Sequence, residues 1–132
     1  MKRQDENLLD SHDAEYYNQR GLAKASQNDF HGAISEFTKA IEIDPQNAVA
    51  YNNRSAAKGK IQYYNGSIDD STKAIEINPQ SDNAYFNRGR TKCHLNDYIG
   101  AIADFTEAIR INHKHATAYF FRPEPNQCHF LK

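Results

Sequence analysis

The chain repeats itself every 34 residues, and this period limits its fold more than any other feature. Residues 14–47 and 48–81 agree at 16 of their 34 aligned positions, far more than unrelated segments would. A fixed period of about 20 to 50 residues indicates stacked units, each of which buries its apolar face against the next. The period runs through most of the chain, as two residue types show: Tyr17, Tyr51, Tyr85 and Tyr119, and Arg20, Arg54, Arg88 and Arg122.

Each unit is predicted to contain two helices. The first helix is expected over residues 14–27, 48–61 and 82–95, and the second over residues 30–43, 64–77 and 98–111. In the second helix of the first unit, Phe30, Ile34, Phe37 and Ile41 recur at spacings of three and four. That spacing places them on one face of an amphipathic helix. The chain is therefore predicted to be all-α.

Turn and cap residues stand at the expected helix boundaries. Residues 28–29 and 96–97 are both Asn-Asp, which favours turns between the helices of a unit. Pro45 and Pro79 follow the second helices, and the residue before a proline is driven out of helical geometry. Asn47 and Ser81 are expected to cap the helices that follow.

Small residues recur where the two helices of a unit must cross. Glycine inside a helix costs about 1 kcal/mol relative to alanine, so Gly21 and Gly89 indicate a close approach of two helices. We expect them to face Ala33 and Ala101, with Ser55 and Ser67 in these roles in the middle unit.

The middle unit departs from the repeat at a core position. Ser71 stands where the first and third units carry Phe37 and Phe105, and Gly59 replaces a larger residue. An empty phenylalanine site can cost several kcal/mol. We expect compensated packing, with Tyr63 turning inward to fill the space; a ligand pocket at Ser71 is the alternative.

These residues together resemble the tetratricopeptide repeat family over residues 14–122. The matching positions are Tyr17, Gly21, Phe30, Ala33, Phe37, Ala40 and Pro45, with their counterparts 34 residues on. The resemblance implies an α-solenoid of three helix–turn–helix units in a right-handed superhelix. We expect an N-terminal extension (1–13), three repeats (14–47, 48–81 and 82–115) and an incomplete fourth repeat with a tail (116–132).

The incomplete fourth repeat is expected to end early. Pro123 and Pro125 interrupt its first helix, because proline removes a helical hydrogen bond and clashes with the preceding turn. The resulting short seventh helix would present Tyr119, Phe120 and Phe121 at the end of the stack, where a terminal repeat needs a polar face. Three outcomes are open: the segment folds back as a cap, the chain associates with itself there, or the segment frays. The alternative function is therefore a self-assembling structural module, a homo-oligomer that docks through these three aromatic residues.

The resemblance implies that the first helices of the units line a concave groove that binds peptides. The inward residues expected there are Asn18, Gln19, Leu22, Asn52, Asn53, Asn83, Phe86, Asn87, Arg90 and His94. Gln19, Asn53 and Asn87 would form a column of amides able to pair with a peptide backbone. Bonds among these amides, or to water, are the alternative. We expect Asn18, Asn53, Asn87 and Arg90 to contribute most.

Family members that grip the acidic C-terminus of a heat-shock protein use a carboxylate clamp. The resemblance places its five positions at Asn18, Leu22, Asn53, Asn83 and Asn87. Only Asn53 matches, and the lysines and arginine that would pair with carboxylate are replaced. Chaperone binding through this clamp is therefore not expected.

Composition and the remaining motifs exclude other classes of function. The net charge is −1, so no basic face for nucleic acid is indicated. The sequence shows no membrane span or signal peptide, and two cysteines make no disulfide framework, which favours a cytoplasmic protein. The histidines lack metal-ligand spacing, and neighbours such as Cys93 and His94 point apart on a helix. We expect no metal, cofactor or catalysis, and a protein or peptide partner.

Overall fold

The computed structural model describes residues 12–114, and this part of the chain consists of six α-helices without a strand. The first helices of the three units are α2 (Ala14–Ser26), α4 (Ala48–Lys60) and α6 (Asp82–His94). The second helices are α3 (Phe30–Ile43), α5 (Tyr64–Ile77) and α7 (Tyr98–Ile111). The all-α solenoid predicted from the sequence is confirmed.

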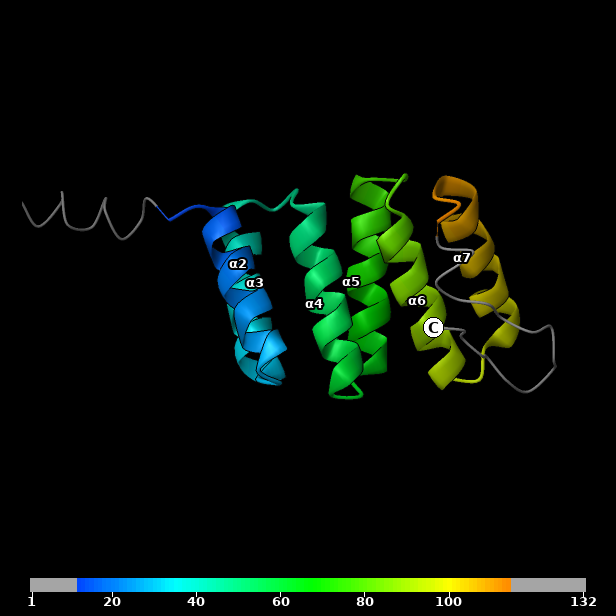
Figure 1. Ribbon diagram of the computed structural model, residues 1–132, viewed down its shortest axis with the longest axis horizontal. Helices are drawn as coiled ribbons and strands as arrows, with labels where there is room; N and C mark the ends of the chain where they lie inside the picture. The colour runs from blue at the N-terminus through cyan, green and yellow to red at the C-terminus, as the bar shows by residue number, and fades with distance from the viewer. Residues whose placement is uncertain (1–11, 115–132) are drawn as a thin grey trace, which may run out of the picture.

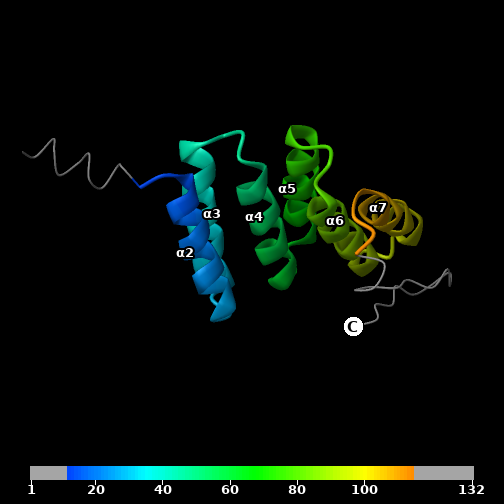
Figure 2. The same cartoon turned by 45° about the horizontal axis from the view of Figure 1, so that its top comes forward.

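The helices stand in pairs along the long axis of the molecule (Figure 1). Each first helix packs on the second helix of its own unit, and each second helix packs on the first helix of the next unit. Among the described helices α2 also contacts α4, and α4 contacts α6, whereas α3, α5 and α7 do not touch one another. Because the first helices lie closer together, they form the inner side of the curved stack. Figure 2 shows the same helices turned by 45°.

The helix ends follow the predicted turn chemistry, with small corrections. Asn47 and Ser81 accept hydrogen bonds from the backbone amides of Ala50 and Ala84, so both are caps as expected. Asp29 and Asp97 cap α3 and α7 in the same way. The three first helices end one residue earlier than predicted, at the residues before Gln27, Ile61 and Leu95.

Left-handed backbone at one residue of each tight turn explains why each first helix stops. Asn28 and Asn96 have φ of 64°, and the equivalent residue of the middle unit, Gln62, has φ of 66°. Asparagine tolerates this conformation better than most residues, whereas glutamine has no such advantage. The middle turn is therefore formed by the surrounding helix packing and not by local preference.

In the first unit, a phenylalanine ring packs against a glycine. Phe37 is 1% exposed, and a Cβ built on Gly21 would lie 2.6 Å from the Phe37 Cδ1 atom. In the third unit Phe105 is fully buried, and a Cβ on Gly89 would lie 2.8 Å from its Cε1 atom. The glycines are therefore required by the ring as much as by the helix crossing.

The middle unit fills the same volume with hydroxyl groups. Ser55, Ser67 and Ser71 are all buried, with exposed fractions of 0 to 1%. The Ser55 hydroxyl donates to the carbonyl oxygen of Ser67 at 2.8 Å, and the Ser71 hydroxyl donates to the same oxygen at 2.9 Å. Ser67 Oγ also lies 3.0 Å from Thr91 Oγ1 of the next unit.

The expectation that Tyr63 turns inward is wrong. Its side chain is 55% exposed, and it lies over Gly66, where an added Cβ would fall 2.7 Å from the ring. Tyr63 is the N-cap residue of α5, and its ring is held there by the Lys58 ammonium, which lies 5.4 Å from the ring centroid. The three buried serines, and not the Tyr63 ring, therefore occupy the region where the other units carry a phenylalanine.

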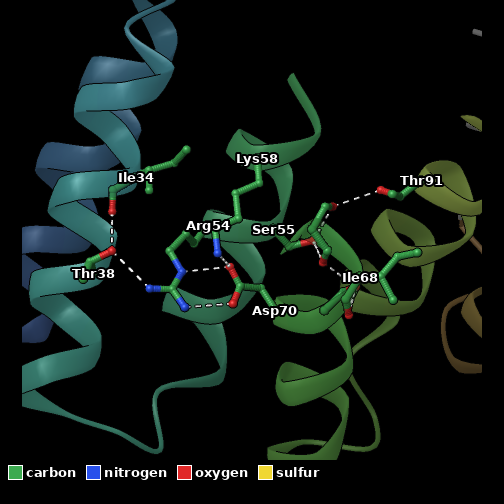
Figure 3. A network of polar contacts seen from close by, with 10 residues as sticks. Ile34, Thr38, Arg54, Ser55, Lys58, Ile68, Asp70 and Thr91 are labelled. Atoms are coloured by element: carbon green, nitrogen blue, oxygen red, sulfur yellow. Dashed lines mark hydrogen bonds and ion pairs between the residues drawn. The ribbon is translucent and has the colours of Figure 1, made fainter. Parts of the chain in front are cut away.

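An ion-pair ladder, with one rung in each unit, joins the first helix of the unit to the second, and Figure 3 shows the rung of the middle unit. Arg54 of α4 donates two hydrogen bonds of 2.8 Å to Asp70 of α5, and a third to Thr38 of the preceding unit at 3.1 Å. Lys58 adds an ion pair to Asp70 at 3.0 Å. The hydrogen bond to Asp70 raises the pKa of Arg54, so the guanidinium stays charged.

The same contacts recur one unit later, where Arg88 binds Asp104 and Thr72. The arginine column identified in the sequence is therefore structural within residues 12–114. Arg54 and Arg88 each tie their own unit together and fasten it to the unit before, whereas Arg20 pairs with Glu36 of its own unit.

Candidate binding groove

Two neighbouring pockets open on the inner side of the stack. The first, of about 430 Å³, lies between α2, α3 and α4 and is mostly apolar. Its lining includes Leu22, Ala25, Phe30, Phe37 and Ala57. The second, of about 110 Å³, lies between α4, α5 and α6 and is lined mainly by polar and basic side chains. We call them the apolar pocket and the polar pocket.

The two pockets occupy equivalent places in successive repeats. Seven residues of the polar pocket each lie 34 residues after a residue of the apolar pocket: Ala56, Gly59, Lys60, Asn87, Arg90, Thr91 and His94. Ala56 and Lys60 line both pockets, so the pockets adjoin across α4. The same place in two successive repeats is therefore an apolar pocket in one and a polar pocket in the other.

Buried amides beside the apolar pocket have no hydrogen-bond partner. Asn53 lines this pocket, and its Nδ2 atom is buried and unbonded within the described part of the chain. Asn18 is 2% exposed, and neither amide atom of its side chain is bonded there. In the next repeat the equivalent pair is bonded, because Asn87 Nδ2 donates to Asn52 Oδ1 at 2.7 Å.

The predicted amide column is therefore not uniform. Gln19 donates to Glu15 on its own helix at 2.7 Å, and Asn87 is bonded to Asn52. Only Asn53 of the three presents a buried amide nitrogen without a partner. Asn87 is thus bonded to an amide outside the predicted column.

The other predicted groove residues are spread along the inner helices. Leu22 lines the apolar pocket and is 44% exposed. Arg90 and His94 line the polar pocket, and the Arg90 guanidinium lies 5.2 Å from the ring centroid of Phe86. Asn83 is exposed near the start of α6 and lines neither pocket.

Sequence reasoning missed the hydroxyls that form the floor of the polar pocket. Ser55, Ser67 and Thr91 line it, together with Gly59. The signal was present in Ser71 and Gly59, which break the repeat, but compensated packing was preferred to a ligand pocket at Ser71 as the explanation. The substitution at residue 71 removes a ring from the core and leaves hydroxyls in contact with the groove.

Two further expectations concern self-association and membrane insertion. The residues predicted for self-association, Tyr119, Phe120 and Phe121, lie outside the described residues, as does the short seventh helix. No described helix has both the length and the apolar character needed to cross a membrane.

Comparison with known proteins gives consistent results. A family model described as TPR repeat matches residues 21–66, and one described as tetratricopeptide repeat matches residues 72–103. No match was found among curated proteins.

Solved structures resemble the chain over most of its length. The Arabidopsis OM64 TPR domain is 30% identical, with a TM-score of 0.75, covering 76% of this chain and 84% of that one. The second TPR of Spaghetti (RPAP3), bound to the HSP90 peptide SRMEEVD, is 27% identical, with a TM-score of 0.74 and coverage of 81% and 99%.

The TPR2B domain of yeast Sti1, in complex with pHsp70, is 26% identical, with a TM-score of 0.74 and coverage of 79% and 83%. The family-model matches, the similarity to the Arabidopsis domain and the paired helices agree with the repeat seen in the sequence. The chain belongs to the tetratricopeptide repeat family.

Proposed function

We propose that this chain is a non-catalytic protein-interaction module that holds an extended segment of its partner along α2, α4 and α6. The observation that carries the proposal is the unbonded Nδ2 atom of Asn53 beside the apolar pocket. A buried donor without a partner costs about 1–3 kcal/mol. A peptide carbonyl would satisfy it while an adjacent side chain of that peptide enters the apolar pocket.

The geometry suits recognition of a backbone with modest sequence preference. An amide nitrogen bonds to any peptide carbonyl, whatever side chain follows it. The apolar pocket then adds selectivity for an apolar side chain, since burying one contributes about 1.5–3 kcal/mol. The peptide complexes of the RPAP3 and Sti1 domains support a groove of this kind.

We infer that the groove does not grip a C-terminal carboxylate as a clamp. Asn18, Leu22, Asn83 and Asn87 are neutral at positions where the clamp carries three cations and an asparagine. The peptide SRMEEVD is a direct probe, because a clamp needs its free terminus. We expect the free and amidated forms of this peptide to bind this chain equally weakly. A marked preference for the free acid would contradict this inference.

The proposal is tested with a random peptide library. Peptides of about twelve residues are selected on the immobilised chain, and the winners are synthesised and measured by fluorescence anisotropy. Asn53→Ala should weaken their binding by about fivefold to tenfold, the effect of losing one hydrogen bond of about 1–1.4 kcal/mol. Gln80→Ala, in an exposed turn, is the matched control and should have no effect.

Two results would overturn the proposal. A selection that yields no binder would remove the groove as a peptide site. Winners that bind Asn53→Ala as tightly as the parent, and that shift NMR signals of α3, α5 and α7 only, would place binding on the other side of the stack.

A further inference from the structure

Three basic side chains surround the polar pocket, and none of the residues 12–114 that line it is acidic. They are Lys60 of α4 and Arg90 and His94 of α6. Their equivalents in the apolar pocket are Ser26, Ala56 and Lys60. One repeat later, the positions of Ser26 and Ala56 have therefore each gained a basic side chain, whereas the position of Lys60 has exchanged its ammonium for the imidazole of His94. This gathering of charge stands in a chain whose net charge is −1.

Lys60 differs from the lysines of the ion-pair ladder. Lys24, Lys58 and Lys92 pair with Glu36, Asp70 and Asp104, at 2.9 to 3.1 Å. Lys60 forms no ion pair within residues 12–114 and is exposed where the two pockets adjoin. Its ammonium group is thus available to a ligand that enters from the groove.

The other two basic side chains are held in place at the pocket. The imidazole of His94 stacks on the ring of Tyr64, with 5.0 Å between centroids and 6° between planes. Arg90 donates to Asn87 Oδ1 at 3.2 Å and lies against Phe86. Side chains that are already oriented lose less freedom when they bind a charged group.

One hydroxyl group in the floor of the polar pocket, that of Ser67, can donate a hydrogen bond to a ligand. The Thr91 hydroxyl donates to the Asn87 carbonyl at 2.9 Å, and the Ser55 hydroxyl donates to the Ser67 carbonyl. Ser67 Oγ lies 3.1 Å from Ser55 Oγ and 3.0 Å from Thr91 Oγ1. With the other two protons in use, the Ser67 proton can serve only one of these two oxygens. An oxyanion in the pocket would offer it a stronger acceptor.

We propose that the polar pocket binds an oxyanion on a side chain of the partner peptide, either the carboxylate of Asp or Glu or the phosphate of a phosphorylated serine or threonine. Lys60 and Arg90 supply the opposing charge, and the Ser67 hydroxyl in the floor of the pocket donates a hydrogen bond to the oxyanion. This proposal rests on the proposed function, because the peptide must lie in the groove. It predicts a partner segment with an apolar side chain for one pocket and an anionic side chain for the other.

The test uses an array of acetylated and amidated nonapeptides, so that no terminal charge contributes. Each peptide carries one leucine at position 4 in a background of alanine and threonine. Glutamate, phosphoserine, glutamine or lysine is placed in turn at positions 5 to 8, which scans the spacing between the pockets. Binding is measured for the parent chain and for Lys60→Gln and Arg90→Gln. Arg110→Gln, which removes an exposed cation on α7, is the matched control.

We expect the anionic peptides at one spacing to bind about tenfold more tightly than the glutamine peptide, as one charge-assisted hydrogen bond provides. This preference should fall severalfold in Lys60→Gln and Arg90→Gln and persist in Arg110→Gln. Comparison of glutamate with phosphoserine identifies which oxyanion is preferred. Circular dichroism of each variant checks that the fold is intact.

Different failures have different meanings. Equal binding of glutamate and glutamine peptides, lost in a variant of the apolar pocket such as Leu22→Ser, would overturn the anion site and leave the groove intact. A preference for lysine would also overturn it. Absence of binding by every peptide would count against the groove itself.

Discussion

The flanking units and the middle unit of this solenoid reach the same backbone by different physical means. In the flanking units a buried phenylalanine packs on a glycine, as Phe37 does on Gly21. In the middle unit the two equivalent residues are Ser71 and Ser55, and their hydroxyls both donate to the carbonyl of Ser67. A phenylalanine with a glycine is therefore one way to fill these two core positions, and a pair of serines is another.

The difference reaches the inner surface. Phe37 helps to line the apolar pocket, whereas hydroxyl groups line the polar pocket one repeat later. The core ring contributes apolar surface to the apolar pocket, and the core hydroxyl groups contribute polar surface to the polar pocket. A repeat protein can therefore change what one segment of its groove binds by changing the core behind it.

The largest expected effect contrasts Phe37 with its counterpart. Phe37→Ala should lower the free energy of unfolding by about 3–5 kcal/mol, because it leaves a cavity against Gly21. Ser71→Ala should cost less than about 1.5 kcal/mol, because its hydroxyl bonds only to carbonyls of its own helix. Urea denaturation measures both. Ile99→Ala, with a side chain that is 86% exposed, is the control, and similar costs for Phe37 and Ser71 would abolish the contrast.

A second experiment asks whether the ring and the glycine belong together. Ser71→Phe alone should destabilise the chain by about 1–3 kcal/mol, because the new ring would meet the Ser55 side chain. Adding Ser55→Gly recreates the pair of the flanking units and should recover much of that loss. A double-mutant cycle gives the coupling free energy, for which we expect about 0.5–3 kcal/mol in favour of the double variant. Strictly additive effects would show that the two positions are independent.

The sequence predicted the fold well because the repeat carries redundant information. Each helix was indicated by apolar spacing, by a cap such as Asn47 and by a turn such as residues 28–29, and these signals agreed. The helix ends were missed by one residue, since fraying and capping blur the last turn. Position 63 was misjudged because exposure of a tyrosine depends on where the turn aims it.

The candidate site was predictable only in part. The inner residues follow from the period and the family resemblance, and Leu22, Asn53 and Arg90 do line the pockets. Which amides are bonded could not be read from spacing: Asn87 finds Asn52, while Asn53 and Asn18 form no such bond. That difference depends on side-chain positions within a fraction of an ångström, which no period encodes.

A third, smaller effect tests the hydroxyl network of the middle unit. Ser67→Ala restores the residue type found at Ala33 and Ala101, and it should cost about 1 kcal/mol or less. The loss is small because Ser67 has one proton for two neighbouring oxygens, and its partners Ser55 and Thr91 keep their carbonyl acceptors.

Thermal unfolding of Ser67→Ala beside Ser35→Ala, an exposed serine of α3, measures this effect. A cost of several kcal/mol would mean that the network, and not the packing around it, holds the middle unit together.

The smallest expected effect compares the ion pair of the first unit with that of the middle unit. Burial opposes ionisation of Glu36, but hydrogen bonds from Lys24 and Arg20 outweigh it and lower the pKa of Glu36 below its ordinary 4.5. A lowered pKa stabilises the fold above pH 4.5, and this contribution disappears as the pH falls through the folded-state pKa. The stability difference between the parent and Glu36→Gln should therefore be present at pH 7 and shrink steadily as the pH falls below 4.5.

The effect should be small because Arg20 is 48% exposed, and water screens its charge, whereas Arg54 is only 17% exposed in the middle unit. Urea denaturation of both proteins at a series of pH values measures the difference. A difference that does not change between pH 7 and pH 3 would show that Glu36 acts through packing. If Glu36→Gln lowered the free energy of unfolding more than Asp70→Asn at pH 7, the more exposed ion pair would be the stronger one, contrary to this prediction.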